Sequence, residues 1–280
     1  AQDLKAFQAE MRKREEQEDE ENIYYLWDVK GRDGKTLSLL FSCPKPAPPP
    51  PEKPALEEPK NKVALIMDDM GFSLGAVSEL LSLKKPITIA ILPYSPLARE
   101  TAQIAHQNGL EILLHLPMES LNNTEENNGI EGLIQATMNA QEIIDSVEKS
   151  IDQVPYVVGV NNHMGSKITP DPVLMEIILE RVKLRNLFFV DSRTTGKSVA
   201  FDVARRLGIP ATQRHVFLDN VPDEESIRKK LIELFTLAQQ EGEAVGICHP
   251  IPSTLSVLRK DFQLVEAYNL KPVFVSEVVR

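Results

Sequence analysis

The sequence predicts an α/β protein in which residues 62–280 form a β/α barrel, complete or incomplete, rather than an open doubly wound sheet. In that part of the chain, short apolar runs alternate with amphipathic stretches of helical period, in about eight units over roughly 220 residues. Nearly every position within each run is apolar, which is typical of parallel strands buried on both faces. Parallel strands require crossover connections, and the helical stretches supply them.

The first 43 residues predict a small separate module. A highly charged stretch, residues 3–22, is expected to form a solvated helix. The β-rich runs IYYLWDV and LSLLFS follow it, and because a turn with Asp33-Gly34 separates them, we expect a β-hairpin. Trp27, the chain's single tryptophan, is interpreted as a packing anchor. We assign this module no chemistry.

Residues 44–61 are expected to form a linker. Eight of the chain's twenty prolines fall within residues 44–60. Proline fixes φ and removes a hydrogen-bond donor, so such a stretch favours polyproline II at about 3.1 Å per residue. At that rise the linker could hold its two ends up to about 50 Å apart.

Eight apolar runs of the main domain are expected as strands. They are residues 63–67, 87–92, 110–116, 156–160, 187–190, a weaker run at 215–218, 244–248 and 272–275. Between them, stretches such as residues 227–238 and 255–265 carry apolar residues at helical spacing and are expected as helices.

Composition argues against two classes of protein. A net charge of −10 and a pI near 5.1 oppose nucleic-acid binding, which needs a basic face. No apolar run approaches the roughly 20 residues of a membrane-spanning helix.

The two cysteines, Cys43 and Cys248, are too few for a disulfide framework. Because the chain starts at Ala1 rather than at a methionine, a removed signal or a membrane anchor upstream of residue 1 is compatible with the sequence.

Polar side chains follow five of the apolar runs, where each predicted strand ends. They are Asp68 and Asp69, His115, Asn161 to His163, Asp191 to Arg193, and His249. The carboxyl ends of barrel strands meet at one mouth, so we expect these side chains to converge. Carboxylates mixed with imidazoles suit zinc or a similar first-row ion, whereas calcium and magnesium prefer oxygen ligands alone. The sequence therefore predicts a divalent metal site, with zinc as the expected ion.

The adjacent carboxylates Asp68 and Asp69 can divide two roles. One can bind the ion while the other faces the bound water as a base, because a metal lowers the pKa of that water to about 7. The structural alternative is capping of the following helix by Asp69 or Ser73. Cys248 precedes His249 on a predicted strand and so points away from it, and we interpret this cysteine as a buried structural residue.

Five segments carry a resemblance to a known family: IMDDMG, LLHLPME, NNHMGS, FVDSRTT and ICHP. In this order and in these strand contexts, they resemble the divergent polysaccharide deacetylase family, a distant branch of the metal-dependent polysaccharide deacetylases with the NodB-type fold. The resemblance covers about residues 62–280. It implies a distorted, incomplete β/α barrel of about seven parallel strands, a carbohydrate substrate and metal-dependent hydrolysis of an N-acetyl group.

The resemblance also implies a set of metal ligands. Asp68 resembles the family's catalytic base, and Asp69 resembles its metal-binding aspartate. His115 matches the first histidine of the second motif, but the position of that motif's second histidine is Glu119 here. The third ligand is then either Glu119 or His163. We favour His163, because imidazole is the usual ligand and NNHMGS directly follows an apolar strand.

The remaining expected roles concern the acid and the oxyanion. His249 resembles the histidine that protonates the leaving amine, and Asp191 is expected to orient it. Backbone N–H groups near Gly165 and Ser166 are expected to stabilise the oxyanion. Two more polar residues are expected to contact substrate, Asn162 and Arg193.

Two alternatives to a metal-dependent carbohydrate deacetylase stay open. One is a metallohydrolase of another acyl or phosphoryl substrate. The other is a non-catalytic envelope protein that keeps the metal pocket and binds glycan or a partner. Aromatic residues make up 6% of the chain, and the site loops carry Phe72, Tyr94 and little else, so a long polysaccharide groove is not evident. The resemblance implies an exported protein of the periplasm or cell envelope, and no obligate protein partner is predicted.

Overall fold

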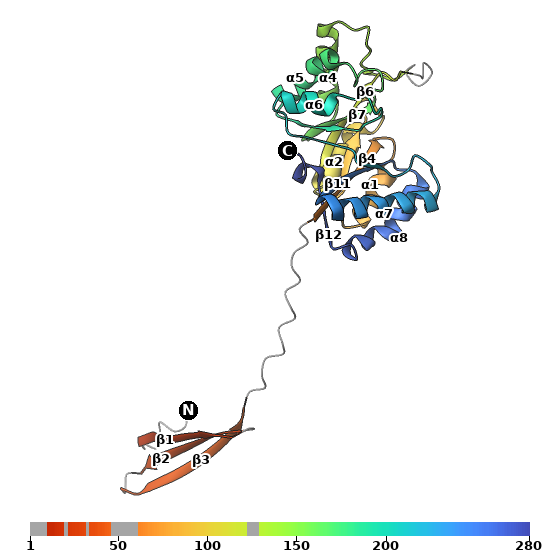
Figure 1. Ribbon diagram of the computed structural model, residues 1–280. Helices are drawn as coiled ribbons and strands as arrows, with labels where there is room; N and C mark the ends of the chain where they lie inside the picture. Colours follow the sequence, from red (N-terminus) through yellow and green to blue (C-terminus); the bar gives the residue numbers. More distant parts are fainter. Residues whose placement is uncertain (1–9, 20–21, 32–33, 46–60, 122–128) are drawn as a thin grey trace. The chain divides into compact units, whose positions relative to one another are not determined.

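The computed structural model describes residues 10–19, 22–31, 34–45, 61–121 and 129–280 (Figure 1). The chain divides into two compact units, Ala1–Glu57 and Glu58–Arg280. Most of the expected proline-rich linker, residues 46–60, lies outside the described residues, so its conformation stays a prediction. No helix of the described residues has the length and apolar character that crossing a membrane requires.

The first unit is a three-stranded antiparallel sheet in the order β1-β2-β3. Its strands are β1 (Glu10–Glu18), β2 (Asn22–Lys30) and β3 (Thr36–Pro44). The expected hairpin is confirmed as β2 and β3, which pair from Asn22 opposite Pro44 to Lys30 opposite Thr36. Trp27 lies at the centre of the sheet, opposite Leu39 on one side and Lys13 on the other.

The helix expected in the charged stretch is wrong for the part that the structure describes, because residues 10–18 form β1. Glutamate, lysine and arginine are good helix formers, but intrinsic propensity is a weak prior that tertiary context overrides. Here the free edge of β2 offers a row of backbone partners, which β1 takes up along nearly its whole length. Charged side chains and β-bulges are both common on edge strands. Strand β1 has both, with a register shift between Lys13 and Glu15.

The second unit is a nine-stranded parallel sheet covered by helices (Figure 1). Its strands are β4 (Asn61–Met70), β5 (Thr88–Ile91), β6 (Ile112–Met118), β7 (Gly159–Met164), β8 (Phe188–Asp191), β9 (Ala211–Gln213), β10 (Val216–Phe217), β11 (Glu243–Cys248) and β12 (Leu270–Val273). Its helices are α1 (Leu74–Ser82), α2 (Ala98–Gln107), α4 (Ala140–Gln153), α5 (Pro172–Leu184), α6 (Ala200–Arg206), α7 (Glu224–Glu241) and α8 (Pro252–Asp261), with the short 3-10 turns η2 (Phe262–Glu266) and η3 (Val275–Glu277).

The sheet curls into an incomplete barrel, as expected. The strand order is β10-β11-β4-β5-β6-β7-β8-β9, so β10 and β9 terminate the sheet at its two ends. Strand β12 pairs with the first half of β4, and β5 pairs with the second half. All eight expected strands are present, and β9 is an additional strand of three residues that the sequence pattern does not reveal. Strand β7 begins later than expected and includes Asn161 to His163, whose backbone pairs with β6.

The amino ends of the strands are closed by the C-terminus of the chain. Ala211 and Arg280 exchange backbone hydrogen bonds of 3.0 and 3.2 Å. Val275 and Val278 belong to a small inner core enclosed by the sheet, with Ile66 among its members. The larger core lies between the sheet and the helices. The site must therefore lie at the opposite, carboxyl ends of the strands, where the crossover loops leave the barrel.

The cap of helix α1 decides one alternative left open by the sequence. Ser73 precedes α1 and its Oγ accepts a hydrogen bond of 3.2 Å from the N–H of Gly75. Ser73 is therefore the cap, and Asp69 remains available to the site.

Candidate metal centre

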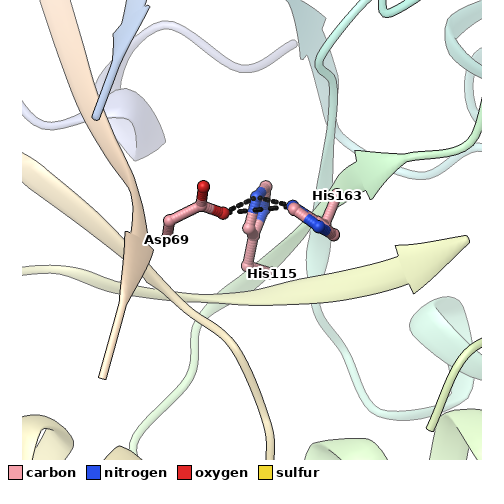
Figure 2. A group of neighbouring side chains, drawn as sticks. All are labelled: Asp69, His115 and His163. Atoms are coloured by element: carbon pink, nitrogen blue, oxygen red, sulfur yellow. Dashed lines mark hydrogen bonds and ion pairs between the residues drawn. The ribbon is translucent and has the colours of Figure 1, made fainter. Parts of the chain in front are cut away.

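Three potential ligand atoms meet in one place, from Asp69 and His163 near the carboxyl ends of β4 and β7 and from His115 in the middle of β6 (Figure 2). Asp69 Oδ1 lies 3.2 Å from His115 Nε2 and 3.1 Å from His163 Nδ1. The two imidazole nitrogens are 3.1 Å from each other. These atoms come from strands separated by more than 40 residues in the chain, and they form a nearly equilateral triangle.

The triangle fits a divalent ion on two grounds. Around an ion with bonds of about 2.0–2.1 Å, neighbouring donor atoms lie about 3 Å apart, which matches the observed spacing. Asp69 Oδ1 is buried and has no hydrogen-bond partner among the described residues, and a buried carboxylate oxygen without a partner is rare in folded proteins. The donor set of one carboxylate and two imidazoles is one that zinc and similar first-row ions accept.

A bulge in β4 aims two successive carboxylates at the same place. The pairing of β4 with β5 shifts register between Met67 and Met70, and Asp69 has a φ of 53°. In a regular strand, successive side chains point to opposite faces, but here Asp68 Oδ2 lies 3.6 Å from His115 Nε2 and Asp69 Oδ1 lies 3.2 Å from the same atom. Left-handed backbone at a residue other than glycine concentrates at functional sites.

The charges in the centre favour a bound cation. Burial alone would lower the pKa of His115, but the carboxylates of Asp68 and Asp69 raise that pKa above its usual value. Burial opposes ionisation of Asp69, yet His115 and His163 hold the pKa of Asp69 below its usual range. The negative potential that stabilises a proton on His115 would equally stabilise a divalent cation at the same nitrogen.

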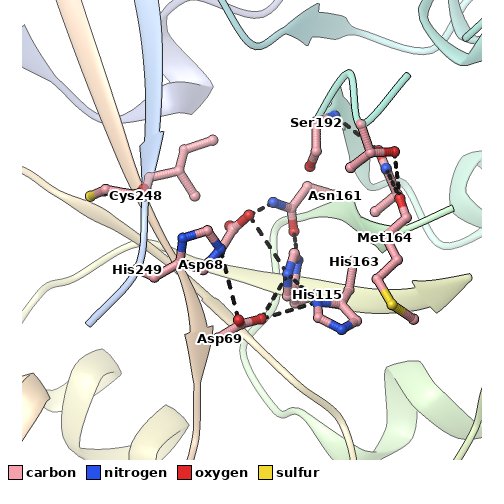
Figure 3. Close-up of polar contacts among 12 residues, drawn as sticks. Asp68, Asp69, His115, Asn161, His163, Met164, Ser192, Cys248 and His249 are labelled. Carbon is pink, nitrogen blue, oxygen red and sulfur yellow. Dashed lines mark hydrogen bonds and ion pairs between the residues drawn. The ribbon is translucent and has the colours of Figure 1, made fainter. Parts of the chain in front are cut away.

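Asn161 connects the expected base to the expected ligand (Figure 3). Its Oδ1 lies 2.8 Å from His115 Nδ1, and its Nδ2 donates a hydrogen bond of 2.8 Å to Asp68 Oδ1. An amide oxygen can only accept, so His115 carries its proton on Nδ1 and keeps the Nε2 lone pair directed at the triangle. Burial raises the pKa of Asp68. The sequence marks Asn161 only as a strand-end residue, and its bridging role depends on the pairing of β6 with β7.

We expect Asn161→Ala to weaken zinc binding by about 10- to 100-fold, the usual cost of losing a group that orients a metal ligand. A competition titration against a zinc chelator measures this loss. Asn162→Ala is the matched control, because that neighbouring amide bonds the backbone of Ser192 and Met164 and touches no candidate ligand. Equal losses in the two variants would show general destabilisation and contradict a specific role for Asn161.

His249 faces the triangle from β11 and is held by Asp219. His249 Nδ1 lies 3.0 Å from Asp219 Oδ1, and its Nε2 is 3.8 Å from Asp69 Oδ2. The other Asp219 oxygen accepts hydrogen bonds from the His249 N–H and from the Thr254 hydroxyl. Burial opposes the imidazolium charge, but Asp219 raises the pKa of His249 to about 9. Asp219 is a site residue that was not predicted from the sequence, although it directly follows the weak apolar run at 215–218, just as Asp68 follows the run at 63–67.

The expectation that Asp191 orients His249 is wrong. Asp191 accepts hydrogen bonds from the Arg193 N–H and the Ser198 hydroxyl, so it shapes the loop after β8. The sheet order explains the error, because β8 lies five strands away from β11, whereas β10, which precedes Asp219, is the direct neighbour of β11. The guanidinium of Arg193 likewise contacts Gln213 of β9 rather than the candidate centre.

Glu119, the alternative metal ligand, is engaged elsewhere. Its Oε1 lies 2.6 Å from Lys167 Nζ, and its Oε2 accepts a hydrogen bond of 2.8 Å from the Ala136 N–H. Although burial opposes ionisation, Lys167 lowers the pKa of Glu119. Glu119 thus ties the loop after β6, through Ala136, to the loop after β7, through Lys167. The structure brings His163, not Glu119, to Asp69 and His115.

A cavity of about 280 Å³ opens above the candidate centre. It is lined by Asp68, His115, Ser120, Asn162, His163, Met164, Ser166, Ser192, Thr194 and His249. Ser166 and Asn162 therefore face the space that we expect a substrate to occupy, whereas Gly165 and Arg193 are not part of the lining. Gly165 instead provides a turn with a φ of 93°, after which its carbonyl accepts hydrogen bonds from Ile168 and Thr169.

Cys248 is buried and stands apart from the polar cluster, as expected. Its Sγ lies 3.6 Å from the Ile66 carbonyl oxygen, on the other side of β11 from the His249 ring (Figure 3). Burial raises the pKa of the Cys248 thiol well above its usual value, which disfavours the thiolate that nucleophilic attack requires.

An incomplete parallel barrel with a polar cluster at the carboxyl ends of its strands is the arrangement expected from the resemblance to the divergent polysaccharide deacetylases. The family model for divergent polysaccharide deacetylases matches residues 65–279, and the chain belongs to this family. It is 37% identical over 213 residues to the uncharacterized protein YibQ of Escherichia coli (strain K12), a match that covers 75% of this chain. The chain spans 64% of the length of that relative.

Solved structures share the fold. The crystal structure of the uncharacterized protein ATU2773 from Agrobacterium tumefaciens C58 superposes with a TM-score of 0.72 at 22% identity, covering 79% of this chain and 89% of that one. The catalytic domain of the peptidoglycan N-acetylglucosamine deacetylase from Eubacterium rectale superposes with a TM-score of 0.50 at 12% identity, covering 76% and 88% of the two chains. At these identities, the likeness establishes the fold alone.

Proposed function

We propose that this protein is a zinc-dependent hydrolase that removes N-acetyl groups from a carbohydrate. The observation that carries the proposal is the triangle of Asp69, His115 and His163, with separations of 3.1–3.2 Å and with Asp68 and His249 beside it. Membership of the divergent polysaccharide deacetylase family supports the carbohydrate substrate. The deacetylase activity named for the Eubacterium rectale protein agrees with the type of reaction.

Asp69, His115 and His163 are the residues that would hold the ion. When bound, a zinc ion would polarise the acetamide carbonyl and lower the pKa of a water molecule to about 7. Asp68 accepts the proton of that water as it attacks the carbonyl carbon. Asn161 occupies Asp68 Oδ1, so Oδ2 is the oxygen available to receive this proton. The general-base contribution of such a carboxylate is typically 10²- to 10⁴-fold in rate, roughly.

His249 completes the reaction by donating a proton to the leaving nitrogen. Asp219 fixes Nδ1, which leaves Nε2 directed at the centre. With its pKa raised to about 9, His249 is largely protonated at neutral pH and can act as an acid. The carbon–nitrogen bond then breaks, and acetate and a free amine leave. Ser166 Oγ accepts a hydrogen bond from the Leu121 N–H and lies 3.2 Å from Ser120 Oγ, and both hydroxyls line the cavity in which a substrate would bind.

The lining of the cavity favours an acyl substrate over a phosphoryl one. Among the described residues that line it there is no lysine or arginine. Phosphoryl transfer depends on cationic side chains or additional metal ions that neutralise the charge on the transferred group. An uncharged acetamide needs no such side chain.

Acetate release from N-acetylglucosamine oligosaccharides tests the proposal. We expect acetate from the zinc-loaded protein and none after chelation, with recovery when zinc is added back. A parallel assay with p-nitrophenyl phosphate should give no product. Tightly bound zinc and retained glycan without acetate release from any oligosaccharide would contradict the proposal and favour a binding protein.

Export to the periplasm or cell envelope is part of the proposal. Two features support export of the domain from the cytoplasm. The family is named for polysaccharide substrates, and the proline-rich stretch at residues 44–61 would suit a domain held away from an anchor. Fractionation of cells that express the full-length gene tests it, and recovery of the protein in the cytoplasm would contradict it.

A further inference from the structure

The three-stranded sheet of the first unit has one apolar face. Residues directly opposite each other on neighbouring strands point to the same face, and Trp27 of β2 lies opposite Leu39 of β3. Side chains alternate between the two faces along each strand, so every second residue joins this pair. The resulting surface, which we call the apolar face, consists of Ile23, Tyr25, Trp27, Val29, Leu37, Leu39, Phe41 and Cys43.

Charged side chains bound the apolar face on one side only. On β1, Lys13 Nζ lies 4.8 Å from the centre of the Tyr25 ring, and Lys13 forms an ion pair with Glu16. The opposite face of β2 and β3 carries polar and charged side chains among a few apolar ones, and the Ser38 hydroxyl there donates a hydrogen bond of 2.6 Å to Asp28. Polar groups are thus confined to β1 and to the opposite face.

The first unit has no core of its own among the residues that the structure describes. Every buried side chain in the described part of the chain belongs to the second unit. An antiparallel sheet commonly packs one face on a core, but no helix or further strand in the described part of the first unit lies over this one (Figure 1). The hydrophobic effect therefore favours a partner that covers the apolar face.

We propose that the apolar face packs against the same face of a second copy of this chain, so that the protein is a dimer held by a six-stranded β-sandwich. Two sheets pack face to face about 10 Å apart. A two-fold axis parallel to the strands, between β2 and β3, places β2 of one copy on β3 of the other. The charged β1 strands then lie at the two outer margins, where Lys13 and Glu16 remain in water. This inference goes beyond the proposed function and depends on neither zinc nor acetate release.

A second copy fits the apolar face better than the chain's own second unit does. The exposed large apolar side chains in the described part of the second unit are divided between the two ends of the barrel, and no helix or loop carries more than two of them. They are Phe72, Leu121, Tyr156, Val158, Val173, Leu184 and Val221. None of these places matches the stripe of apolar side chains on a sheet of nine-residue strands.

Two further features favour a second copy as the partner. Residues 44–61 are expected to be extended because of their prolines, which opposes folding back of the first unit onto the second. A two-fold interface uses the same patch on both subunits, so the patch must complement itself. A flat apolar surface with its charges along one margin meets this condition.

Analytical ultracentrifugation of the full chain over a dilution series tests the dimer. We expect the mass to rise from 31.4 kDa to twice that value as the concentration increases. Trp27 is the chain's single tryptophan and belongs to the apolar face, so its fluorescence reports the same event. Its emission should shift to shorter wavelength over the same concentration range, because the indole ring leaves water. A mass of 31.4 kDa at all concentrations up to about 100 µM would overturn the proposal.

Leu37→Glu and Leu40→Glu are a matched pair of variants. Both leucines lie on β3 and are 62% and 67% exposed, but Leu37 belongs to the apolar face and Leu40 to the opposite face. In the dimer, only Leu37→Glu places a charge in the interface. We expect Leu37→Glu to raise the dissociation constant of the dimer at least about tenfold, and Leu40→Glu to change it by less than about threefold.

Other results would identify another arrangement, and each of them overturns the proposal. Equal weakening of the dimer by both variants would indicate pairing along the open edge of β3 rather than packing of the two faces. A monomer whose Trp27 emission already lies at short wavelength would indicate that the same chain covers the apolar face. The dilution series on the wild-type chain needs no substitution, so it decides for or against the dimer even where Leu37→Glu fails to fold.

Discussion

Asp69→Asn is expected to abolish stoichiometric zinc binding while the fold stays intact. Asp69 has a φ of 53°, a region that aspartate and asparagine tolerate better than most residues other than glycine. Asparagine therefore keeps the backbone and the side-chain volume, and the substitution removes only the charge. Loss of a group that merely orients a ligand costs about 10- to 100-fold in metal affinity, so loss of a charged ligand should cost more than about 100-fold.

Elemental analysis of the protein after equilibration with zinc and gel filtration measures this effect. We expect about one zinc per wild-type chain and less than about 0.1 per Asp69→Asn chain. Glu119→Gln is the informative control, since both Glu119 oxygens are taken by Lys167 and the Ala136 N–H, and it should retain its zinc. Full zinc in Asp69→Asn, or zinc loss in Glu119→Gln alone, would show that the ion is held by a different set of residues.

The candidate centre could be predicted from sequence because barrel topology makes strand ends converge. Asp69, His115 and His163 each stand at the polar end of an apolar run, and this rule places them at one mouth without any knowledge of distances. The direction of each side chain could not be predicted in this way. Asp68 and Asp69 both face His115 because β4 bulges against β5, and the register shift depends on pairing between residues about 20 positions apart.

The expectations for Asp191 and for residues 10–18 were wrong because both depend on which strands are neighbours in a sheet. Asp191 and Asp219 both end apolar runs, but only Asp219 lies beside His249, since β10 pairs with β11. The strands at the two ends of the sheet, β9 and β10, have three and two residues, which is too few for a periodic pattern. The neighbours of these strands in the sheet could therefore not be predicted from the sequence. For residues 10–18, local propensity favours a helix, and pairing with the hairpin edge overrides it.

Asp68→Asn is expected to lower the rate of acetate release by at least about 100-fold and to leave zinc content unchanged, because Asp68 is assigned as the base and not as a ligand. Its Oδ1 accepts from Asn161, and an asparagine could keep this bond through its amide oxygen while placing an NH₂ group where Oδ2 now lies. The variant thus removes the proton acceptor and preserves its surroundings. Asp202→Asn, an exposed aspartate at the start of α6, controls for a change of one unit in net charge.

The two measurements on Asp68→Asn separate catalysis from assembly of the site. A chain that binds one zinc and has lost turnover supports the division of labour between Asp68 and Asp69 that the bulge in β4 creates. A chain that loses zinc together with activity would make Asp68 a ligand, and its 3.6 Å approach to His115 Nε2 would then be part of the coordination shell. A chain that keeps both would require another base. His249 would be the first to test, because its Nε2 lies 3.8 Å from Asp69 Oδ2 and its side chain lines the same cavity as Asp68.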